Sequence, residues 1–397
     1  MATRPVDADT TVDPIAANLD PEALDRLSGK IRSDIEASRY AAASILIARG
    51  DTIAYRDEIG EVAPGRTGQP DDVYLLMSLS KAFAATLVLR AIDHGRLTLD
   101  SRVAEILPQF GARGKQTVTV RQLLTHTAGT YAGFPPPPPL TVAQDVGDLA
   151  KNVAVISALP LSFTPGSQVV YNPFASYAVL GQLLVEIDDQ GRSFAQIARD
   201  EIFDPLGMAD TTYGFAVDDP RRVPVSVGQS DTGVTDKGMF EILNTAFTEH
   251  SEHPAGGAFG TTLDVYKFTQ AMRGHGTRGD HRLMSAAMFD YACRIHTGDM
   301  RNGFWDFDRE SNGIPEFPAN LSLLGGYVRG TGHYLTPFGQ TASPSTFGAV
   351  GGGSTFWMVD PERDLTFVFL SAGFLEGLDH FARLQQLSDL ALAAVAD

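Results

Sequence analysis

The sequence predicts an α/β protein with an antiparallel sheet built from both chain ends, flanking helices and a mostly helical lobe beside the sheet. Two observations lead to this fold class: paired β-rich runs lie near each terminus, and the long region between them has helical spacing. Because 397 residues exceed what one simple core organises, we expect two domains. We place a flexible segment at 1–20, the α/β domain at 21–77 and 255–397, and the mostly helical domain at 78–254.

The α/β domain is predicted to begin with a helix and a hairpin. After Pro21, apolar residues recur at helical spacing, which predicts a helix with an inward face of Leu24, Leu27, Ile31 and Ile35. The next stretch, AAASILIARGDTIAYRDEIG, contains two β-rich runs on either side of Gly50 and Asp51. This dipeptide suits a tight turn, so the two runs are predicted to pair.

The helical domain is predicted to open with a helix from about Ser78. Its inward face would carry Phe83, Leu87, Ala91 and Ile92, and Gly95 stands where a C-terminal cap belongs. One of the following loops contains FPPPPPL at residues 134–140. Five consecutive prolines exclude a helix or a central strand, so we expect a stiff polyproline-type segment on the surface.

The C-terminal part is predicted to return to the α/β domain. AGGAFGTTLDVYKFTQAM is typical of a glycine-rich entry into a helix. STFWMVDPERDLTFVFLSAG then contains two β-rich runs, and Asp360, Pro361, Arg363 and Asp364 mark the turn between them. This second hairpin gives the sheet its C-terminal strands.

Composition excludes several classes of partner. The formal net charge of −17 is spread along the chain, so neither nucleic acid nor an anionic membrane surface is expected to bind. The N-terminus lacks the features of a secretory signal, and no apolar run reaches the roughly 20 residues of a membrane helix. The single cysteine excludes an intrachain disulfide. We expect a soluble, cytoplasmic protein that acts on a small molecule, and the oligomeric state is left open.

One lysine stands in a pattern that suggests chemistry. The chain has only six lysines, and Lys81 alone has a serine three residues before it, Ser78. On a helix that begins near Ser78, the two side chains lie one turn apart on one face. A desolvated lysine can lose its proton and act as a base, which arginine cannot do. The structural alternative is that Ser78 caps the helix while Lys81 extends to solvent.

The surrounding blocks extend this pattern to most of the chain. LLMSLSKAFAATLVLRAIDHGRLTLDSRVAEILPQF, TVTVRQLLTHTAGT, FTPGSQVVYNPFASYAVLGQLLVEI, IFDPLGMADTTY, PAGGAFGTTLDVYKF and FGAVGGGSTFWMVDPE occur in this order. Together they resemble the serine β-lactamase and penicillin-binding protein superfamily, in particular its class C-like branch with family VIII carboxylesterases. The resemblance implies the serine β-lactamase-like fold, with the active site in the cleft between the two domains. It implies no metal and no organic cofactor.

The resemblance also assigns catalytic roles. Ser78 corresponds to the nucleophile that is acylated, and Lys81 corresponds to the base that activates it. The second family motif is Tyr-x-Asn, and Tyr171 matches its tyrosine. Its asparagine is displaced: Asn172 comes one place early and Pro173 occupies the expected position. Asn172 is therefore either a substrate-binding residue or the N-cap of a helix whose first residue is Pro173.

The third family motif departs further from the family pattern. Lys-Thr-Gly or His-x-Gly is expected, whereas the aligned triplet is Ala349, Val350 and Gly351, so the basic residue is missing. The next residue, Gly352, falls where the family places an oxyanion-hole N–H beside that of Ser78. Because the missing residue helps to hold a substrate carboxylate, recognition of β-lactams and cell-wall peptides is in doubt.

Four other residues that could carry chemistry are histidines. His333 precedes the third motif and is a candidate for lining the substrate pocket. His126 is expected to be structural. His250 and His253 flank Glu252 with the spacing of a metal pair, but no third ligand cluster supports a site, so a solvated loop is predicted.

The sequence thus predicts a serine hydrolase that forms an acyl-enzyme, most simply a carboxylesterase on small to medium esters. Within the same class, the alternatives are an amidase, a β-lactamase-like enzyme and an acyltransferase. A lyase or aldolase reaction that uses Lys81 and Tyr171 as acid and base is a further alternative. A catalytically silent binding module is disfavoured because Ser78, Lys81 and Tyr171 are all present.

Overall fold

The main sheet joins the two ends of the chain, as predicted. The computed structural model describes residues 10–133, 136–228, 238, 241–331, 335–374 and 377–396. Seven strands follow the order β3-β2-β1-β12-β11-β10-β9, and all their pairings are antiparallel. The strands are β1 (Ala42–Arg49), β2 (Thr52–Ala63), β3 (Arg66–Thr67), β9 (Tyr327–Val328), β10 (Phe347–Gly351), β11 (Thr355–Asp360) and β12 (Leu365–Ser371).

Both predicted hairpins are present, and they meet at the centre of the sheet. β1 and β2 turn at Gly50 and Asp51, while β11 and β12 turn between Asp360 and Leu365. β1 pairs with β12 from Ala43 opposite Ser371 onwards, so the N-terminal and C-terminal hairpins form one continuous surface. This pairing makes the α/β domain depend on both chain ends.

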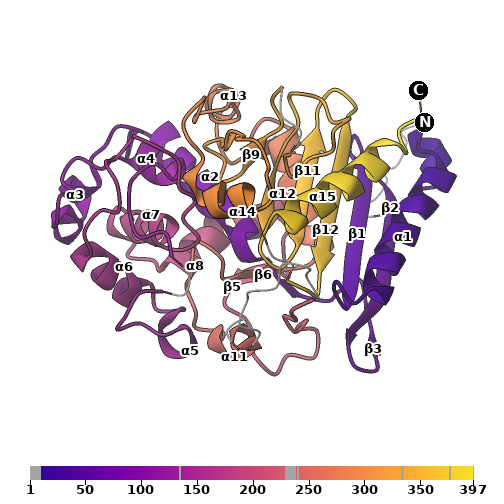
Figure 1. Ribbon diagram of the computed structural model, residues 1–397, viewed down its shortest axis with the longest axis horizontal. Coiled ribbons are helices and arrows are strands. Elements are labelled where there is room, and N and C mark those ends of the chain that lie inside the picture. Colours follow the sequence, from indigo (N-terminus) through magenta and orange to yellow (C-terminus); the bar gives the residue numbers. More distant parts are fainter. Residues whose placement is uncertain are drawn as a thin grey trace.

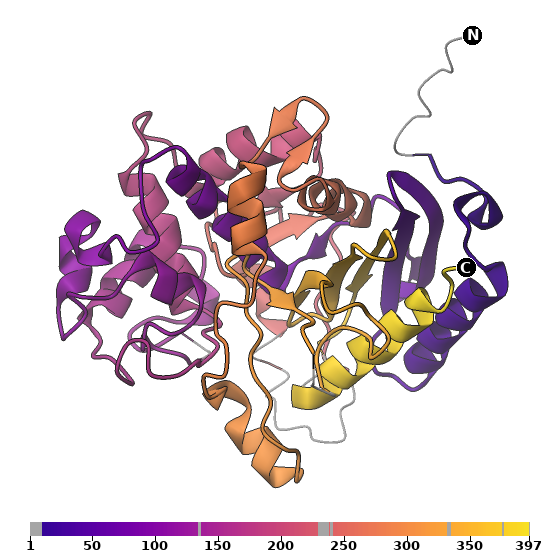
Figure 2. The ribbon, with the colours of Figure 1, turned by 90° about the horizontal axis from the view of Figure 1, so that it is seen from above.

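Helices cover the two faces of the sheet (Figures 1 and 2). α1 (Pro21–Glu36) and α15 (Gly377–Leu392) lie on one face, and α12 (Thr262–Arg273) lies on the other. α1 buries Leu24, Leu27 and Ile31, as its spacing predicts, and begins after Asp20, whose side chain accepts a hydrogen bond from the Glu22 N–H.

The other helices gather mainly in a lobe beside the sheet (Figure 1). In that lobe α2 is apolar on all sides and buries 11 of its 14 residues, which makes it the lobe's central helix. The elements are α2 (Ser80–Asp93), α3 (Val103–Ile106), α4 (Val120–Leu124), α5 (Val142–Asp145), α6 (Leu149–Ala158), α7 (Ala175–Glu186), α8 (Phe194–Ala198), a π-helical turn (Arg199–Phe203), α9 (Asp204–Leu206) and α11 (Leu243–Ala246). Two further helices, α13 (Ala286–Ala292) and α14 (Asp306–Ser311), lie in the connection back to the sheet.

The predicted start of α2 is wrong by two residues. A 3-10 turn, Met77–Leu79, precedes the helix, which begins at Ser80. Met77 has a φ of 50°, a conformation that costs free energy for a side chain of this kind. The predicted cap at Gly95 is confirmed, since Gly95 has a φ of 75° directly after the last turn.

A three-stranded sheet lies immediately before this turn. β4 (Tyr74–Leu75) and β5 (Thr212–Tyr213) pair on either side of β6 (Ala258–Gly260), and the Leu76 N–H donates to the Ala258 carbonyl at 2.8 Å. Hydrogen bonds to β6 therefore hold the chain in place as far as Leu76, the residue before Met77. A separate short hairpin joins β7 (Thr277–Arg278) and β8 (His281–Arg282).

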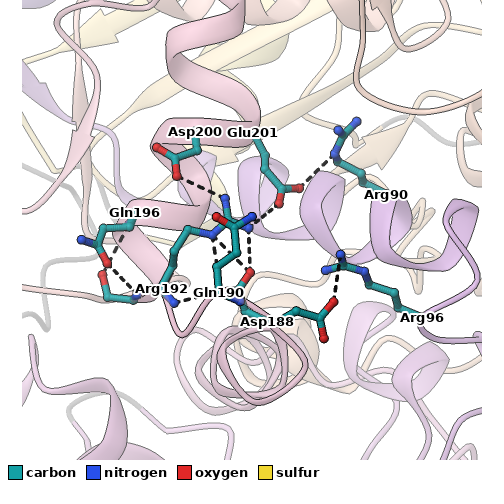
Figure 3. A network of polar contacts seen from close by, with 10 residues as sticks. Arg90, Arg96, Asp188, Gln190, Arg192, Gln196, Asp200 and Glu201 are labelled. Atoms are coloured by element: carbon teal, nitrogen blue, oxygen red, sulfur yellow. Dashed lines mark hydrogen bonds and ion pairs between the residues drawn. The ribbon is translucent and has the colours of Figure 1, made fainter.

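An ion-pair network ties α2 to the loop after α7 (Figure 3). Arg192 donates to Asp188 at 2.6 Å, to Glu201 at 2.8 Å and to Asp200 at 3.1 Å. Arg90 of α2 donates to the other carboxylate oxygen of Glu201 at 2.9 Å. These charge-assisted hydrogen bonds are partly buried, so they hold the central helix of the lobe more firmly than exposed pairs would.

Two further features from the sequence analysis are the polyproline segment and the absence of long apolar runs. The polyproline segment lies partly outside the described residues, and its described part, residues 136–140, forms no helix or strand. In the described part of the chain, no helix is both long and apolar enough to span a membrane.

A buried carboxyl links the sheet to α12 and makes stability depend on pH. Glu58 accepts from Ser44 at 2.9 Å, and Ser44 also bonds Thr262 at the start of α12 at 2.5 Å. Burial raises the pKa of Glu58 from 4.5 to about 8. The folded state therefore holds one more proton than the unfolded state between these two values, and stability is lost as pH rises through this window.

We predict that Glu58→Gln restores part of the stability that the wild-type protein loses as pH rises. Glutamine keeps an acceptor for Ser44 but has no proton to lose, so the variant should melt roughly 2 °C higher than wild type at pH 8.5. At pH 4.5, where Glu58 is protonated in the folded state, the difference should vanish or reverse. Thermal melts at both pH values measure this; an equal shift at both would mean that Glu58 ionisation is not the cause.

Candidate active site

Ser78 and Lys81 meet as the sequence predicts. Lys81 lies in the first turn of α2, and its Nζ is 2.9 Å from the Oγ of Ser78 in the preceding 3-10 turn. Lys81 is only 1% exposed, whereas Ser78 is partly exposed. Lys81 therefore does not extend to solvent, and the structural alternative for this pair is wrong. A serine that is open to a ligand is in contact with a fully desolvated amine.

The other hydrogen-bond partners of Lys81 are backbone carbonyls. Its Nζ donates to the Ala255 carbonyl at 2.8 Å and to the Pro173 carbonyl at 3.2 Å. A carbonyl oxygen only accepts, so each one takes an N–H. In the neutral amine the remaining position is the lone pair, which is directed at Ser78 Oγ. The two carbonyls thus orient the amine so that it can take the serine proton.

Burial also makes the neutral amine available. Desolvation lowers the pKa of Lys81 from 10.5 to about 7. Among the described residues, no carboxylate forms an ion pair with Lys81, so no negative charge stabilises its ammonium form. The neutral, basic form of the amine is therefore accessible near neutral pH.

Tyr171 lies against the same pair. Its ring centre is 5.2 Å from Lys81 Nζ, and its hydroxyl lies near enough to Ser78 for that side chain to affect the pKa of Tyr171. Ionisation of the tyrosine is disfavoured: burial raises the pKa of Tyr171 from 10.0 to about 12, and the nearby Ser78 side chain opposes this rise only in part. Tyr171 is therefore a neutral phenol, which suits a proton donor or relay rather than a base.

Asn172 faces the protein backbone. Its Oδ1 accepts from the Phe174 N–H at 3.1 Å and the Ser176 N–H at 3.2 Å, and its Nδ2 donates to Tyr131 and Thr130. Because α7 begins at Ala175, the predicted helix start at Pro173 is wrong, although Asn172 still accepts from the first-turn N–H groups. The geometry favours the structural role of Asn172 over substrate binding.

Pro173 contacts Lys81 through its backbone carbonyl. This residue occupies the position at which the family pattern has an asparagine side chain, and its carbonyl contacts Lys81 at 3.2 Å. His126 fixes this turn: its Nδ1 accepts the Asn172 N–H at 2.9 Å, and its ring lies against Tyr171 with the centres 4.6 Å apart. The structural role predicted for His126 agrees with these contacts.

Strand β10 and the turn after it close the site beside Ser78. Thr355 donates to the Leu76 carbonyl at 2.8 Å, and a Cβ at Gly351 would lie 2.5 Å from the same oxygen, so only glycine fits there. Gly352 follows directly, packed against the Phe374 ring. These contacts bring the glycine turn next to the Met77–Leu79 turn, and the oxyanion role of Ser78 and Gly352 stays a prediction.

At the position where the third family motif has a basic residue, this chain has an apolar side chain. Ala349 is only 1% exposed and packs in the core between the sheet and the helical lobe, while Val350 faces the opposite core beneath α15. Neither side chain presents a charge. Arg329 does not replace the base, because its guanidinium is buried and donates to the carbonyls of Gly339 and Gly330. His333 lies outside the described residues.

Aromatic residues that the sequence did not single out line the other side of Tyr171. Phe304 packs edge-on against Tyr171 at 5.4 Å between ring centres, and Trp305 packs against Phe304 and Phe381. Both come from the segment that carries α14 and projects from the body of the protein (Figure 2). The described residues around the adjacent pocket include Trp305, Phe317, Tyr327 and Phe381, and none of them is charged.

One expectation about the histidines is wrong. His250 is exposed, as expected for a solvated loop, but His253 is buried against Phe174. Burial and the nearby Lys81 lower the pKa of His253 to about 3, so its ring is neutral. Its place two residues before Ala255, just ahead of the PAGG block, is the only sequence signal that could have pointed to it.

Comparison with known proteins identifies the family to which this chain belongs. The beta-lactamase family model matches residues 27–391, which include Ser78, Lys81, Tyr171 and the β10 turn. The chain belongs to the beta-lactamase family. The predicted family and the predicted mixed α/β fold are both confirmed, and with them the expectation of a serine hydrolase superfamily.

Relatives in this family carry several activities. Esterase EstB from Burkholderia gladioli is 28% identical, with 93% of this chain and 95% of that protein covered. A putative D-alanyl-D-alanine carboxypeptidase from Escherichia coli is 24% identical, with 91% and 85% covered. Among solved structures, EstCE1, a hydrolase with promiscuous acyltransferase activity, has a TM-score of 0.74 at 20% identity and covers 95% of this chain and 99% of its own. A family VIII carboxylesterase has a TM-score of 0.71 at 22% identity, with 94% and 98% covered.

Proposed function

We propose that this protein is a carboxylesterase that hydrolyses small to medium esters through an acyl-enzyme on Ser78. The observation that carries this proposal is the contact between Ser78 Oγ and a buried Lys81 whose other two N–H groups are taken by carbonyls. A serine hydroxyl is a weak nucleophile until a positioned base removes its proton. The name of EstB supports ester hydrolysis among the activities of the family.

The proposed reaction begins with attack of Ser78 Oγ on the ester carbonyl carbon while its proton passes to Lys81 Nζ. The oxyanion lies against the N–H groups of Ser78 and Gly352. When the C–O bond to the alcohol breaks, Tyr171 gives its phenolic proton to the leaving oxygen and regains one from the Lys81 ammonium. Water then attacks the acyl carbonyl carbon and loses a proton to the neutral Lys81 amine. The bond between the acyl group and Ser78 Oγ breaks, and the proton returns to Ser78 Oγ from Lys81, with Tyr171 as a relay.

Esters are favoured over β-lactams and cell-wall peptides for an electrostatic reason. Those substrates carry a carboxylate, and the position that would bind it holds the buried Ala349. The described lining of the pocket beside Tyr171 adds no cationic side chain. A lost charge-assisted contact costs roughly 1.5 to 3 kcal/mol, or about one to two decades in kcat/KM. The acylation machinery itself is unaffected by this loss.

We predict clear esterase activity beside weak or absent β-lactamase activity. The test compares kcat/KM for p-nitrophenyl butyrate and a chromogenic cephalosporin, in wild type and Ser78→Ala. The ester should be preferred by at least tenfold, and Ser78→Ala should lose both activities. A fluorophosphonate probe should label Ser78 in wild type only. A cephalosporin preferred by tenfold, or an active protein without an adduct on Ser78, would overturn the proposal.

A further inference from the structure

We propose that His253 is a positioning residue of the site: stacked on Phe174, it holds the two carbonyl groups that orient Lys81. Phe174 directly follows Pro173, and His253 comes two residues before Ala255. The two rings are 5.1 Å apart between centres with an interplanar angle of 26°. One ring contact thus joins the two segments whose carbonyls receive the Lys81 N–H groups. The inference rests on the proposed role of Lys81 as the base.

The segment that carries His253 is seated firmly on the helical lobe. We name residues 252–255 the strap. Glu252 accepts the Ala195 N–H at 3.0 Å, and Pro254 packs on α7 where a Cβ at Gly181 would lie 2.3 Å from Pro254 Cγ. His253 itself is 4% exposed. The strap therefore has little freedom, and its final residue, Ala255, presents its carbonyl to Lys81 in a fixed place.

The ring acts through shape rather than through charge or hydrogen bonding. Its Nδ1 is buried and has no hydrogen-bond partner in the described part of the chain. The titratable groups that face Lys81 are Tyr171 and Tyr177, whose rings lie 5.2 and 5.6 Å from its Nζ, and the neutral rings of His126 and His253. A phenylalanine at position 253 would keep the stack and lose no bond at Nδ1, whereas an alanine would remove the stack and admit water.

The experiment compares His253→Ala with His253→Phe, and uses His250→Ala as the control. His250 lies three residues away, and its side chain is 88% exposed. The first readout is the NMR titration of Lys81 in protein labelled with 13C-lysine, since only six lysines contribute signals and Lys81→Arg identifies the relevant one. The second readout is the pH profile of kcat/KM for p-nitrophenyl butyrate.

We expect His253→Ala to raise the Lys81 midpoint by about one pH unit, because water in the vacated space relieves the desolvation of the ammonium. The acid limb of kcat/KM should move by the same amount, and kcat/KM at pH 7 should fall about fivefold. His253→Phe and His250→Ala should keep the wild-type midpoint and profile. A purely structural role would lower the melting temperature without moving the Lys81 midpoint.

Two results would overturn the inference. One is a folded His253→Ala protein with an unchanged Lys81 midpoint, and the other is His253→Phe behaving like His253→Ala. If His253→Ala does not fold, Gly181→Ala displaces the strap through Pro254 while His253 stays intact, and the same shift is expected. Because the NMR titration needs no substrate, a shifted midpoint in a protein without ester turnover would uphold the positioning role while refuting the proposed function.

Discussion

Lys81→Arg should abolish ester turnover almost as completely as Ser78→Ala, with a loss of about a thousandfold or more in kcat/KM. The physical reason is that the residue at position 81 must be able to accept a proton. Arginine keeps the positive charge but stays protonated in proteins, so it cannot take the proton of Ser78. The pKa of about 7 that burial imposes on Lys81 is what makes the lysine usable as a base. Turnover of p-nitrophenyl butyrate measures the effect.

The chain offers a matched control for this substitution. Lys115 is also 1% exposed, and its Nζ also donates to a backbone carbonyl, that of Leu159, but it lies outside the site. Lys115→Arg should change stability without abolishing turnover, and melting curves should show both arginine variants to be folded. If Lys81→Arg retained near-native activity, Lys81 would serve only as a fixed charge and the proposed base would be wrong.

The fold and the reacting pair could be predicted because their signals are local. Ser78 and Lys81 are three residues apart, so any helical turn brings them together. The hairpin turns at Gly50 and near Asp360 likewise follow from residue types that favour turns. A sheet built from both chain ends followed from the β-rich runs near each terminus. The domain boundaries drawn from these patterns stay a prediction.

The supporting contacts of the site could not be predicted because they are made by the backbone. A carbonyl oxygen carries no residue-type signal, and Lys81 reaches the one at Ala255 across 174 positions of sequence. The same holds for the 3-10 turn at Met77–Leu79. This turn has a positive φ at Met77 and lies where Gly351 closely approaches the Leu76 carbonyl, a long-range contact that only the folded structure reveals.

The displaced motif shows how a side-chain pattern can miss a contact that the backbone makes. Asparagine is absent from its expected place, and the sequence alone leaves open whether Asn172 substitutes for it. In the structure the backbone of Pro173 contacts Lys81, while Asn172 and His126 fix the turn around it. A motif search compares residue types, so it cannot recognise a contact that a backbone carbonyl makes.

Tyr171→Phe should lower kcat for ester hydrolysis by about a hundredfold to a thousandfold, with little change in folding stability. The substitution removes only the hydroxyl near Ser78 and leaves the ring against His126 and Phe304. With the pKa of Tyr171 at about 12, the lost group is a phenol that donates a proton, so departure of the alcohol should suffer most. Esters of poorly leaving alcohols, such as ethyl butyrate, should therefore lose more activity than p-nitrophenyl butyrate, whose leaving group needs little protonation.

Tyr177→Phe is the matched control for this last prediction. Tyr177 is fully buried, and its ring lies 5.6 Å from Lys81 Nζ, but its hydroxyl donates to the Leu124 carbonyl at 3.4 Å. Its loss should cost at most about 1 kcal/mol of stability and leave kcat nearly unchanged. Equal losses of kcat in both variants would mean that the tyrosine rings merely shape the pocket of Lys81. A loss confined to Tyr171→Phe, and larger for ethyl butyrate, assigns the proton of the leaving alcohol to the Tyr171 hydroxyl.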